Sequence, residues 1–417
     1  MTVAVVVGAG FAGLNAAKTL ANHDDLSVIL VDHRNHHLFQ PLLYQVATAG
    51  LNPADIAVPI RVQFRSAPNV QIHLGHVRGV NLEQQKVLGG DRDFPFDYLI
   101  LACGARHSYF GHPEWEEFAP GLKTLEQATE IRRRMLVAFE RAENDLDPAS
   151  QLSYLTFVVV GGGPTGVELA GAIADISRTA MRGDFRRIDP AKSHIILVEA
   201  GPRVLPTFSE EISEHARRDL ADIGVDVRTN AKVEAIDQEG VTVGTQKVHA
   251  RSVFWAAGVQ AERLEVVPPL ETDRAARVKV NDDLSVPGHP NVFVVGDMAA
   301  FTMETGALLP GVAPAAIQAG THAAEMILGD LVREARRPFR YNDKGQMATI
   351  GKSRAVAQIG RITLTGRIAW LTWLFVHVAS LIGFRNRMSV LFSWFWSYMF
   401  SKREARLITE KEWRLRN

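Results

Sequence analysis

"TVAVVVGAGFAGLNAAKTL", residues 2–20, joins an apolar run to a glycine-rich turn and then to a helical pattern. The run is apolar throughout, which is typical of a parallel strand covered on both faces. Gly8 permits a tight turn, Gly10 lets the backbone approach a pyrophosphate, and Gly13 lets the helix pack closely on the strand. The next apolar run ends in Asp32, where a carboxylate can bind the diol of a ribose. The stretch therefore predicts a strand–turn–helix unit that binds a dinucleotide.

The same spacing recurs later in the chain, in "VVVGGGPTGVELAG". Gly161, Gly163 and Gly166 repeat the three glycines, and the strand-like run that follows ends at Glu199. Two such units predict two dinucleotide sites. Glu199 favours NADH over NADPH, because a 2′-phosphate would lie against its carboxylate. Arg203, close after it, would weaken that preference, and NADH is the nucleotide that we expect.

Composition narrows the kinds of protein that this chain can be. Its 417 residues suffice for two or three domains. Lys and Arg total 46, as do Asp and Glu, so the net charge indicates no nucleic-acid partner. Cys103 is the only cysteine, which excludes an internal disulfide, a redox cysteine pair and a four-thiolate metal site. We expect Cys103 to be a packed small side chain, and we expect no bound metal.

A third stretch, "HPNVFVVGDMAA", supports the interpretation that the two nucleotides are a flavin and a nicotinamide. Its strand ends in Gly296-Asp297, a carboxylate at the place where a sugar-like hydroxyl can bind, although Gly-Asp alone is more often a turn. With the first glycine fingerprint, "LILACGA" and "FWAAGV", it resembles the two-dinucleotide flavoproteins of the disulfide reductase superfamily. That resemblance implies an α/β fold with two Rossmann-like domains, FAD in the first and NAD(P)H in the inserted second.

Longer motifs narrow the resemblance to one family. They are "HHLFQPLLYQVATAGLNPADIAVPIR", "YFGHPEWEEFAPGLKTLEQA", "FRRIDP" and a tryptophan-rich tail. From end to end the chain resembles the type II NADH dehydrogenases, single-subunit NADH:quinone oxidoreductases. The resemblance implies transfer of a hydride from NADH to non-covalent FAD and of two electrons to a membrane quinone such as ubiquinone, in a respiratory chain and without proton pumping.

The resemblance also implies particular cofactor contacts. The stretch "PLLYQ", Pro41 to Gln45, would lie beside the isoalloxazine, Val77 near the adenine of FAD, and Gly258 near the nicotinamide. The full set expected for FAD is Gly8, Gly10, Gly13, Asp32, Pro41, Leu42, Val77, Ala102, Gly296, Asp297, Ala313 and Pro314. The set expected for NADH is Gly161, Gly163, Gly166, Glu199 and Gly258.

Two polar residues are candidates for the quinone side. The family signature is Ala-Gln-x-Ala-x-Gln, and the matching stretch here is "APAAIQAG". Gln318 matches the second glutamine, but Pro314 replaces the first. Gln318 or backbone groups would then contact the quinone, or the quinone lies differently; Gln318 could also be a purely structural hydrogen-bonding group. Glu168 matches a family carboxylate proposed for proton delivery, and its alternative role is to complement the helix dipole.

The motifs divide the chain into four parts. Residues 1–150 and 273–335 are expected to form a discontinuous FAD-binding domain. Residues 151–272 are expected to bind NADH, and residues 336–417 to associate with a membrane.

The tail from Ile368 to Phe400 holds four of the chain's seven tryptophans. We expect two helices, Ile368–Phe384 and Met388–Phe400, joined at a corner formed by Arg385, Asn386 and Arg387. Both are shorter than the roughly 20 apolar residues that cross a bilayer. Serines recur every fourth residue on the second helix and give it a polar edge: Ser389, Ser393 and Ser397. Basic residues suited to anionic lipid are Arg385, Arg387, Lys402, Arg403 and Arg406.

These features predict a pair of amphipathic helices lying in one leaflet, with lipid contacts through residues 368–406. A helical hairpin buried in a dimer interface and a true membrane span are the alternatives. We expect a homodimer at the cytoplasmic face of the inner (plasma) membrane. The competing functions are a soluble NADH-dependent reductase of a small iron–sulfur protein and a flavin-containing interaction protein that senses NADH.

Overall fold

The computed structural model describes residues 1–400 and 405–409. The chain forms two compact units, each assembled from stretches that are distant in sequence. The first unit comprises Met1–Leu38, Ala57–Arg106 and Val259–Lys344. The second unit comprises Phe39–Ile56, His107–Gly258 and the described residues from 345 onward.

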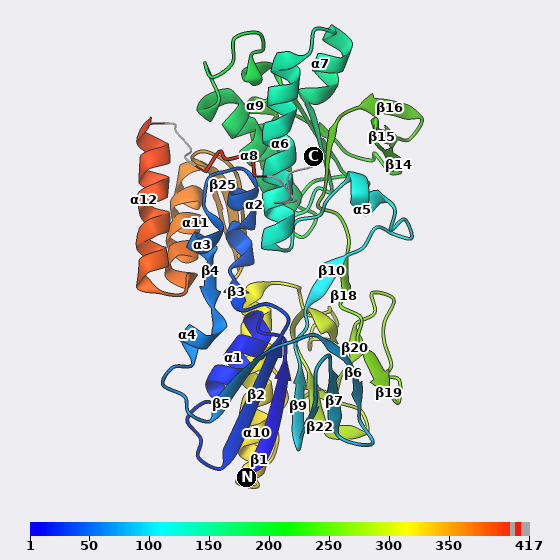
Figure 1. Ribbon diagram of the computed structural model, residues 1–417, viewed down its shortest axis with the longest axis vertical. Helices are drawn as coiled ribbons and strands as arrows, with labels where there is room; N and C mark the ends of the chain where they lie inside the picture. The colour runs from blue at the N-terminus through cyan, green and yellow to red at the C-terminus, as the bar shows by residue number, and fades with distance from the viewer. Residues whose placement is uncertain (401–404, 410–417) are drawn as a thin grey trace, which may run out of the picture. The chain divides into compact units, whose positions relative to one another are not determined.

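A mostly parallel sheet forms the centre of the first unit (Figure 1). Strand β1 (Thr2–Val7) lies between β2 (Leu26–Asp32) and β9 (Tyr98–Leu101) and is parallel to both. The second half of β1 is almost fully buried, as its unbroken apolar run predicted. The strand order is β21 (Ser285–Val286), β22 (His289–Val294), β9, β1, β2 and β5 (Val70–Leu74).

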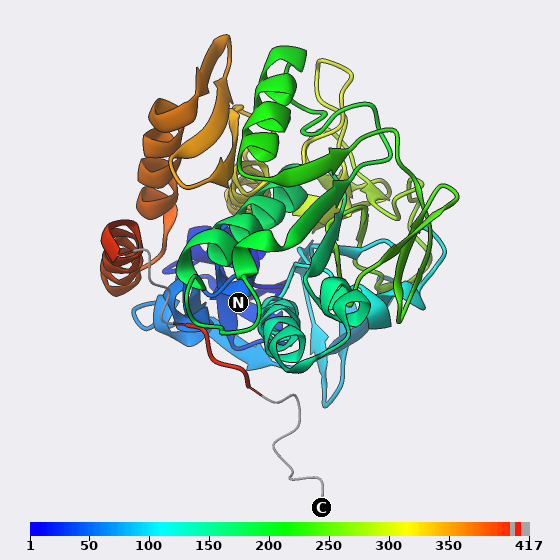
Figure 2. The ribbon, with the colours of Figure 1, turned by 90° about the horizontal axis from the view of Figure 1, so that it is seen from above.

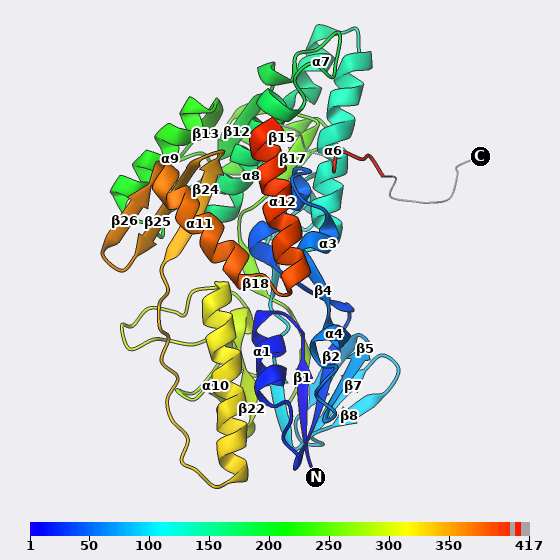
Figure 3. The ribbon, with the colours of Figure 1, turned by 90° about the vertical axis from the view of Figure 1, so that its left-hand side faces the viewer.

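Helices α1 (Phe11–Thr19) and α10 (Ala313–Leu331) lie side by side in the first unit (Figure 3). Their backbones approach closely because small residues face each other. A Cβ atom on Gly320 of α10 would lie only 2.1 Å from the carbonyl oxygen of Ala12 in α1. The glycine at this position therefore sets how near α10 comes to the first glycine loop.

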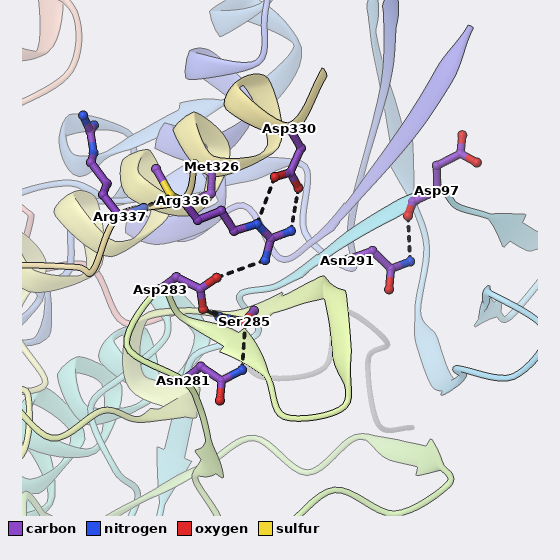
Figure 4. A network of polar contacts seen from close by, with 9 residues as sticks. All are labelled: Asp97, Asn281, Asp283, Ser285, Asn291, Met326, Asp330, Arg336 and Arg337. Carbon is purple, nitrogen blue, oxygen red and sulfur yellow. Dashed lines mark hydrogen bonds and ion pairs between the residues drawn. The ribbon is translucent and has the colours of Figure 1, made fainter. Parts of the chain in front are cut away.

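A polar network fastens the chain beyond α10 to the edge of the same sheet (Figure 4). The guanidinium of Arg336 pairs with Asp330 at 2.5 Å and with Asp283 at 3.0 Å. Both carboxylates raise the pKa of Arg336, and all three side chains are only about one fifth exposed. Asp283 also accepts a hydrogen bond from the hydroxyl of Ser285 in β21, at 2.6 Å. The end of α10 is thereby held against the strand that begins the sheet.

Smaller sheets complete the first unit. One has the order β19 (Glu265–Val267), β6 (Val77–Asn81), β7 (Lys86–Gly89) and β8 (Asp93–Pro95). Another pairs β3 (His36–Leu38) with β4 (Ala57–Pro59).

The second unit repeats the parallel arrangement of the first. Strand β11 (Thr156–Val160) lies between β12 (His194–Val198) and β17 (Ser252–Trp255), and β13 (Val225–Arg228) follows at the edge. The helix α8 (Pro164–Asp175) begins directly after the second glycine loop. Other helices of this unit are α2 (Leu43–Ala47), α3 (Pro53–Ile56), α6 (Leu125–Asn144), α7 (Pro148–Tyr154) and α9 (Glu210–Asp222).

Arg132 of α6 joins three separate segments of the second unit. Its buried guanidinium donates to the carbonyl oxygens of Val46 at 2.8 Å, Leu51 at 3.2 Å and Ala405 at 3.1 Å. Burial lowers the pKa of Arg132, so the three carbonyls supply the stabilisation that water would otherwise give its charge. The arginine thus connects α6, the segment after α2 and the chain beyond the last helix.

The described C-terminal part folds onto the second unit as a small sheet and two helices (Figure 2). The sheet consists of β24 (Gln346–Gly351), β25 (Arg354–Ile359) and β26 (Ile362–Thr365), and α8 packs against β24. Helix α11 (Gly366–Ser380) packs on β25, and α12 (Phe384–Phe400) contacts α3.

The corner between these helices was predicted in the wrong place. The turn lies at residues 381–383, and Arg385 to Arg387 belong to the first turn of α12. Helix α11 is capped by Leu381, which is extended, and Gly383, directly before α12, adopts a φ of +87°, a left-handed conformation that suits glycine. Arg387 donates to the carbonyl oxygens of Leu381 at 2.8 Å and Ala379 at 3.0 Å. The arginine therefore satisfies carbonyls at the end of α11 instead of forming the bend.

One side of each of these two helices packs on the second unit, and the other side is apolar and exposed. The polar edge of α12 faces the unit, where Ser389 donates to Asp55 at 2.7 Å. Large apolar side chains stand on the exposed sides of both helices: Ile368, Leu371, Phe375, Phe384, Met388, Phe392, Phe395 and Met399. Within the described residues, every helix is too short or too polar to cross a bilayer. Lys402 and Arg403 lie outside the described residues.

The contact between α1 and α10 predicts that alanine substitutions at two glycines of α10 change the free energy of unfolding in opposite directions. Gly320→Ala should lower the free energy of unfolding by roughly 1–3 kcal/mol, because its Cβ would collide with a backbone carbonyl. The matched control is Gly329→Ala on the same helix, whose Cβ would make only ordinary contacts beginning at 3.6 Å. It should raise stability by roughly 0.5–1 kcal/mol, because alanine favours helix. Chemical denaturation of both variants measures the difference, and equal effects would contradict the close approach.

Candidate functional site

The first glycine loop is closed by a carboxylate from the neighbouring strand. Gly8 has a φ of +98°, and a Cβ there would lie 2.4 Å from the carbonyl oxygen of Ala102. Asp32, at the end of β2, accepts the N–H of Ala9 at 2.6 Å and the N–H of Arg34 at 2.7 Å. The loop, the end of β9 and the carboxylate are therefore held together at the carboxyl ends of three parallel strands, where nucleotides bind in such sheets.

The second glycine loop has the same construction. Gly161 has a φ of +112°, and a Cβ there would lie 2.7 Å from the carbonyl carbon of Ala256. Glu199 accepts the N–H of Gly162 at 2.6 Å and the N–H of Gly201 at 2.6 Å. Glu199 thus has the position in the second unit that Asp32 has in the first. Each unit has one carboxylate beside one glycine turn.

The closeness of helix to loop is the same in both units. A Cβ on Gly13 would lie 1.8 Å from the carbonyl oxygen of Gly8, and one on Gly166 would lie 1.8 Å from that of Gly161. By contrast, a Cβ on either Gly10 or Gly163 would meet no atom within 4 Å. The middle position therefore opens toward the space that a pyrophosphate needs, which fits a bound dinucleotide in each loop.

His37 supports the first loop and was missed by the sequence reasoning. Its Nδ1 lies 2.9 Å from the carbonyl oxygen of Ala9, and its ring packs edge-on against Phe11. Since a carbonyl only accepts, Nδ1 carries the proton in this bond. Burial lowers the pKa of His37, so the ring is neutral near pH 7. Only the pairing of β3 with β4 brings this side chain under the loop.

Gly296 and Asp297 lie near the first glycine loop and the start of α10. A Cβ on Gly296 would lie 3.3 Å from the Cβ of Ala12, and Gly311 lies beside the carboxylate of Asp297. Ala313 and Pro314 form the first turn of α10, where proline is favoured and backbone N–H groups are free to bind a ligand. The structure therefore brings together most residues predicted for FAD in the first unit, whereas Val77 begins β6 in a separate sheet.

The remaining predicted contacts belong to the second unit. Pro41 and Leu42 form a short 3₁₀ turn before α2. Gly258 has a φ of +62°, and a Cβ there would lie 2.6 Å from the ring of Phe110. Phe110 is itself unusual, because it is 68% exposed and has a φ of +52°. An exposed aromatic ring held beside Gly258 is a surface suited to a flat heterocycle, and the sequence pattern did not indicate it.

Gln318 does not present a free amide. Its amide nitrogen donates to the carbonyl oxygen of Asn342 at 3.0 Å, and its amide oxygen accepts the N–H of Asn342 at 2.9 Å. The side chain therefore pairs with the backbone of the segment that follows α10.

Glu168 of α8 is a carboxyl group partly withdrawn from water. Burial raises its pKa to about 8, opposed by the N–H of Thr349, which donates to the carboxyl at 3.4 Å. At pH 7 the carboxyl therefore holds its proton, as a proton donor should. Cys103 is different: burial raises the pKa of its thiol to about 12, and the thiol contacts the Val7 carbonyl at 3.9 Å. A thiol in that state is a poor nucleophile.

Comparisons with known proteins agree along the whole chain. Residues 2–320 match the family of pyridine nucleotide-disulphide oxidoreductases, and residues 344–403 match the NDH2 C-terminal domain. The chain is 44% identical to the type II NADH:quinone oxidoreductase Ndh of Mycobacterium tuberculosis, over 98% of this chain and 90% of that protein. It is also 44% identical to NdhA of the same organism, over 98% and 89%. The solved structure of NDH2 from Plasmodium falciparum in complex with NADH superposes with a TM-score of 0.88 at 20% identity, covering 97% of this chain and 99% of that one.

The two acids allow the nucleotide loops to be told apart. Glu199→Ala should raise the ratio of kcat/KM for NADPH to that for NADH by roughly 10-fold, because it removes a charge that repels a 2′-phosphate. Asp32→Ala, which removes the equivalent acid of the other unit, should weaken retention of FAD and leave that ratio unchanged. Steady-state kinetics and the flavin absorbance of the purified variants measure both effects. A changed ratio in Asp32→Ala alone would reverse the assignment.

The buried carboxyl predicts a pH effect on stability. The folded protein holds the Glu168 proton more tightly than the unfolded chain, whose glutamate pKa is about 4.3. This contribution is fully present below that value and is lost as pH rises through about 8. Across that range the wild type should lose stability relative to Glu168→Gln, and the difference should level off above it. Denaturation at a series of pH values tests this, with Glu140→Gln on an exposed part of α6 as the control; parallel curves for wild type and Glu168→Gln would contradict it.

Proposed function

The chain belongs to the type II NADH:quinone oxidoreductases, and from that membership we propose which of its residues bind, orient and protonate the reactants. It is an FAD-dependent enzyme that oxidises NADH and reduces a quinone. The two alternative functions, reduction of an iron–sulfur protein and NADH sensing, lack support, because the relatives that match along the whole chain are quinone oxidoreductases. Bound FAD supplies the two-electron redox chemistry.

We assign FAD to the first glycine loop and NADH to the second. The first loop offers the turn around Gly8, the carboxylate of Asp32 for a ribose diol, and Asp297 beside the first turn of α10. The second loop offers Glu199, whose length and charge disfavour a 2′-phosphate. Arg203 does not reach toward that carboxylate; it donates to the carbonyl oxygen of Pro206 at 3.0 Å. On this assignment residues 1–150 and 273–335 serve FAD, and residues 151–272 serve NADH.

The protein's own chemical task is to supply protons and exclude water. A quinone takes up two protons with its two electrons, and Glu168 holds a proton at neutral pH. We therefore assign proton supply to Glu168. Gln318 is better explained as a structural residue, because both ends of its amide are already bonded to Asn342.

We propose that the enzyme binds a lipid surface through the exposed apolar sides of α11 and α12. Family members are peripheral membrane enzymes. Phe375 is 73% exposed and Phe395 is 60% exposed, although burying such a ring in an apolar phase is worth about 1.5–3 kcal/mol. Tyr398 of α12 is 48% exposed, and its ring lies 5.8 Å from that of the half-buried Trp370 of α11; such rings suit the boundary between headgroups and acyl chains. We propose the cytoplasmic face of the inner (plasma) membrane, where NADH is supplied, and a homodimer as the assembly.

This proposal predicts that replacing two exposed phenylalanines of α11 and α12 with glutamates weakens the binding of the enzyme to lipid. Phe375→Glu with Phe395→Glu should weaken binding to anionic vesicles by roughly 100-fold, because two buried rings are replaced by charges. Oxidation of NADH by a long-chain quinone dissolved in the vesicles should fall with it, while a short-chain water-soluble quinone should still be reduced.

The matched control places the same charges on two exposed leucines elsewhere in the second unit. Leu146→Glu with Leu152→Glu should leave vesicle binding and both quinone activities unchanged. Vesicle flotation and NADH absorbance measure the two quantities. Wild-type binding by the double phenylalanine variant would refute the lipid proposal, and failure of the wild type to reduce either quinone would refute the function.

A further inference from the structure

Phe110 lies on the surface of the second unit in a conformation that its side chain disfavours. The ring is 68% exposed, and the backbone φ is +52°, in the left-handed region. Both features cost free energy, because the side chain crowds the backbone in that region and the exposed ring leaves apolar surface in water. Among the phenylalanines whose exposure the structure describes, the others that are more than half exposed lie on α11 and α12. Phe110 belongs to neither helix and requires another explanation.

The residues before Phe110 hold its backbone in place. The carbonyl oxygen of Ser108 accepts the indole N–H of Trp255 at 3.1 Å, and the N–H of Ser108 donates to the carbonyl oxygen of Gly258 at 3.2 Å. Tyr109 is buried, and its ring stacks on that of Trp255 with 5.0 Å between centroids. The segment is therefore fixed to the end of β17 while the next side chain, Phe110, stands outward.

The order of the strands in this unit indicates which half of a dinucleotide would lie near that end of β17. Strand β11, which leads into the second glycine loop, lies between β12 and β17. A dinucleotide lies across the ends of the strands at such a position, with its pyrophosphate at the glycine loop and its adenosine ribose at the acid that follows the second strand. That acid is Glu199, directly after β12. The nicotinamide half therefore extends to the other side of β11, over the end of β17.

The chain after β17 runs from the glycine loop to Phe110. Ala256, the residue after β17, lies against the loop, because a Cβ on Gly161 would lie 2.7 Å from its carbonyl carbon. Gly258 is two residues further along and lies within about 7 Å of Ala256. A Cβ on Gly258 would lie 2.6 Å from the ring of Phe110. A Cβ on Gly111, the next residue, would meet no atom within 4 Å, so the space beside the aromatic residue is open.

We propose that the ring of Phe110 lies against the nicotinamide ring of NADH and orients it at the end of β17. This inference rests on the proposed function, which assigns NADH to the second loop. Contact between the two flat rings removes apolar surface of both from water, and aromatic pairs gain further from offset or edge-to-face packing. Phe110 is therefore a binding residue for the nicotinamide end of the nucleotide, whereas Glu199 acts on the adenosine end.

The experiment compares two ligands that differ by the nicotinamide ring. NAD⁺ and ADP-ribose share the adenosine, the pyrophosphate and the second ribose, and ADP-ribose lacks the nicotinamide. Titration calorimetry of the full-length, FAD-loaded enzyme measures the Kd of each. Phe110→Ala should raise the Kd of NAD⁺ by roughly 10-fold, because a ring contact is lost, and leave that of ADP-ribose within about 2-fold of the wild type. The KM for NADH should rise with it, whereas reoxidation of the reduced flavin by a water-soluble quinone should keep its rate.

Four further variants separate a ring contact from a general effect. Phe110→Tyr keeps the flat ring and should bind NAD⁺ as the wild type does, whereas Phe110→Leu keeps an apolar side chain without the ring and should weaken NAD⁺ alone. Glu199→Ala should raise both Kd values by the same factor, because the acid contacts the part that the two ligands share. Leu152→Ala removes another exposed apolar side chain of the second unit and should change neither value.

The outcomes are distinct. A wild-type ratio of the two Kd values in Phe110→Ala and Phe110→Leu would overturn the inference and leave the nucleotide assignment intact, whether both ligands bind normally or both bind more weakly. Weak binding of NAD⁺ by Phe110→Tyr would overturn it as well, because the flat ring is still present. If Phe110→Ala does not retain FAD, Phe110→Leu decides. Unchanged Kd values of both ligands in Glu199→Ala would instead refute the assignment of NADH to the second loop, and this inference with it.

Discussion

The approach of one backbone to another at the two glycine turns is the constraint on which the rest of the structure depends. In each unit the helix after the first strand comes so near the turn that a single Cβ would lie 1.8 Å from a carbonyl oxygen. That closeness brings the helix N-terminus and the carboxylate of the next strand to the same edge of the sheet. Because both units are built this way, the chain has two glycine turns with different acids, Asp32 and Glu199, to which we assign the two nucleotides.

The second recurring constraint is the burial of ionisable side chains. Glu168 keeps its proton, and His37 and His377 are neutral, because burial disfavours their charged forms. The buried guanidinium of Arg132 is compensated by three carbonyl oxygens. Such groups must be hydrogen-bonded to be tolerated. Glu168, His37 and Arg132 bond to other segments of the chain, whereas His377 bonds within its own helix. Most of these bonds therefore hold distant segments of the chain together.

The C-terminal helix α12 has a polar side and an exposed apolar side with different contacts. The polar edge of α12 turns inward, where Ser389 bonds Asp55 and Trp394 bonds Gln45. These contacts leave the apolar sides of both helices exposed. An exposed apolar surface and a hydrogen-bonded contact with α2 thus lie on opposite sides of the same helix.

The sequence by itself determined the two nucleotide turns, their acids and the limited length of the tail helices, because each depends on residues that are neighbours along the chain. The spacing of three glycines and the length of an apolar run are local properties. Tertiary structure alone decided the rest. It placed the helix corner at Gly383, because Arg387 folds back onto the carbonyls of α11. It also decided that the amide of Gln318 bonds to the backbone of Asn342 and that the hydroxyl of Tyr44 bonds to that of Thr349. Such partners meet only when segments that are distant in sequence pack together.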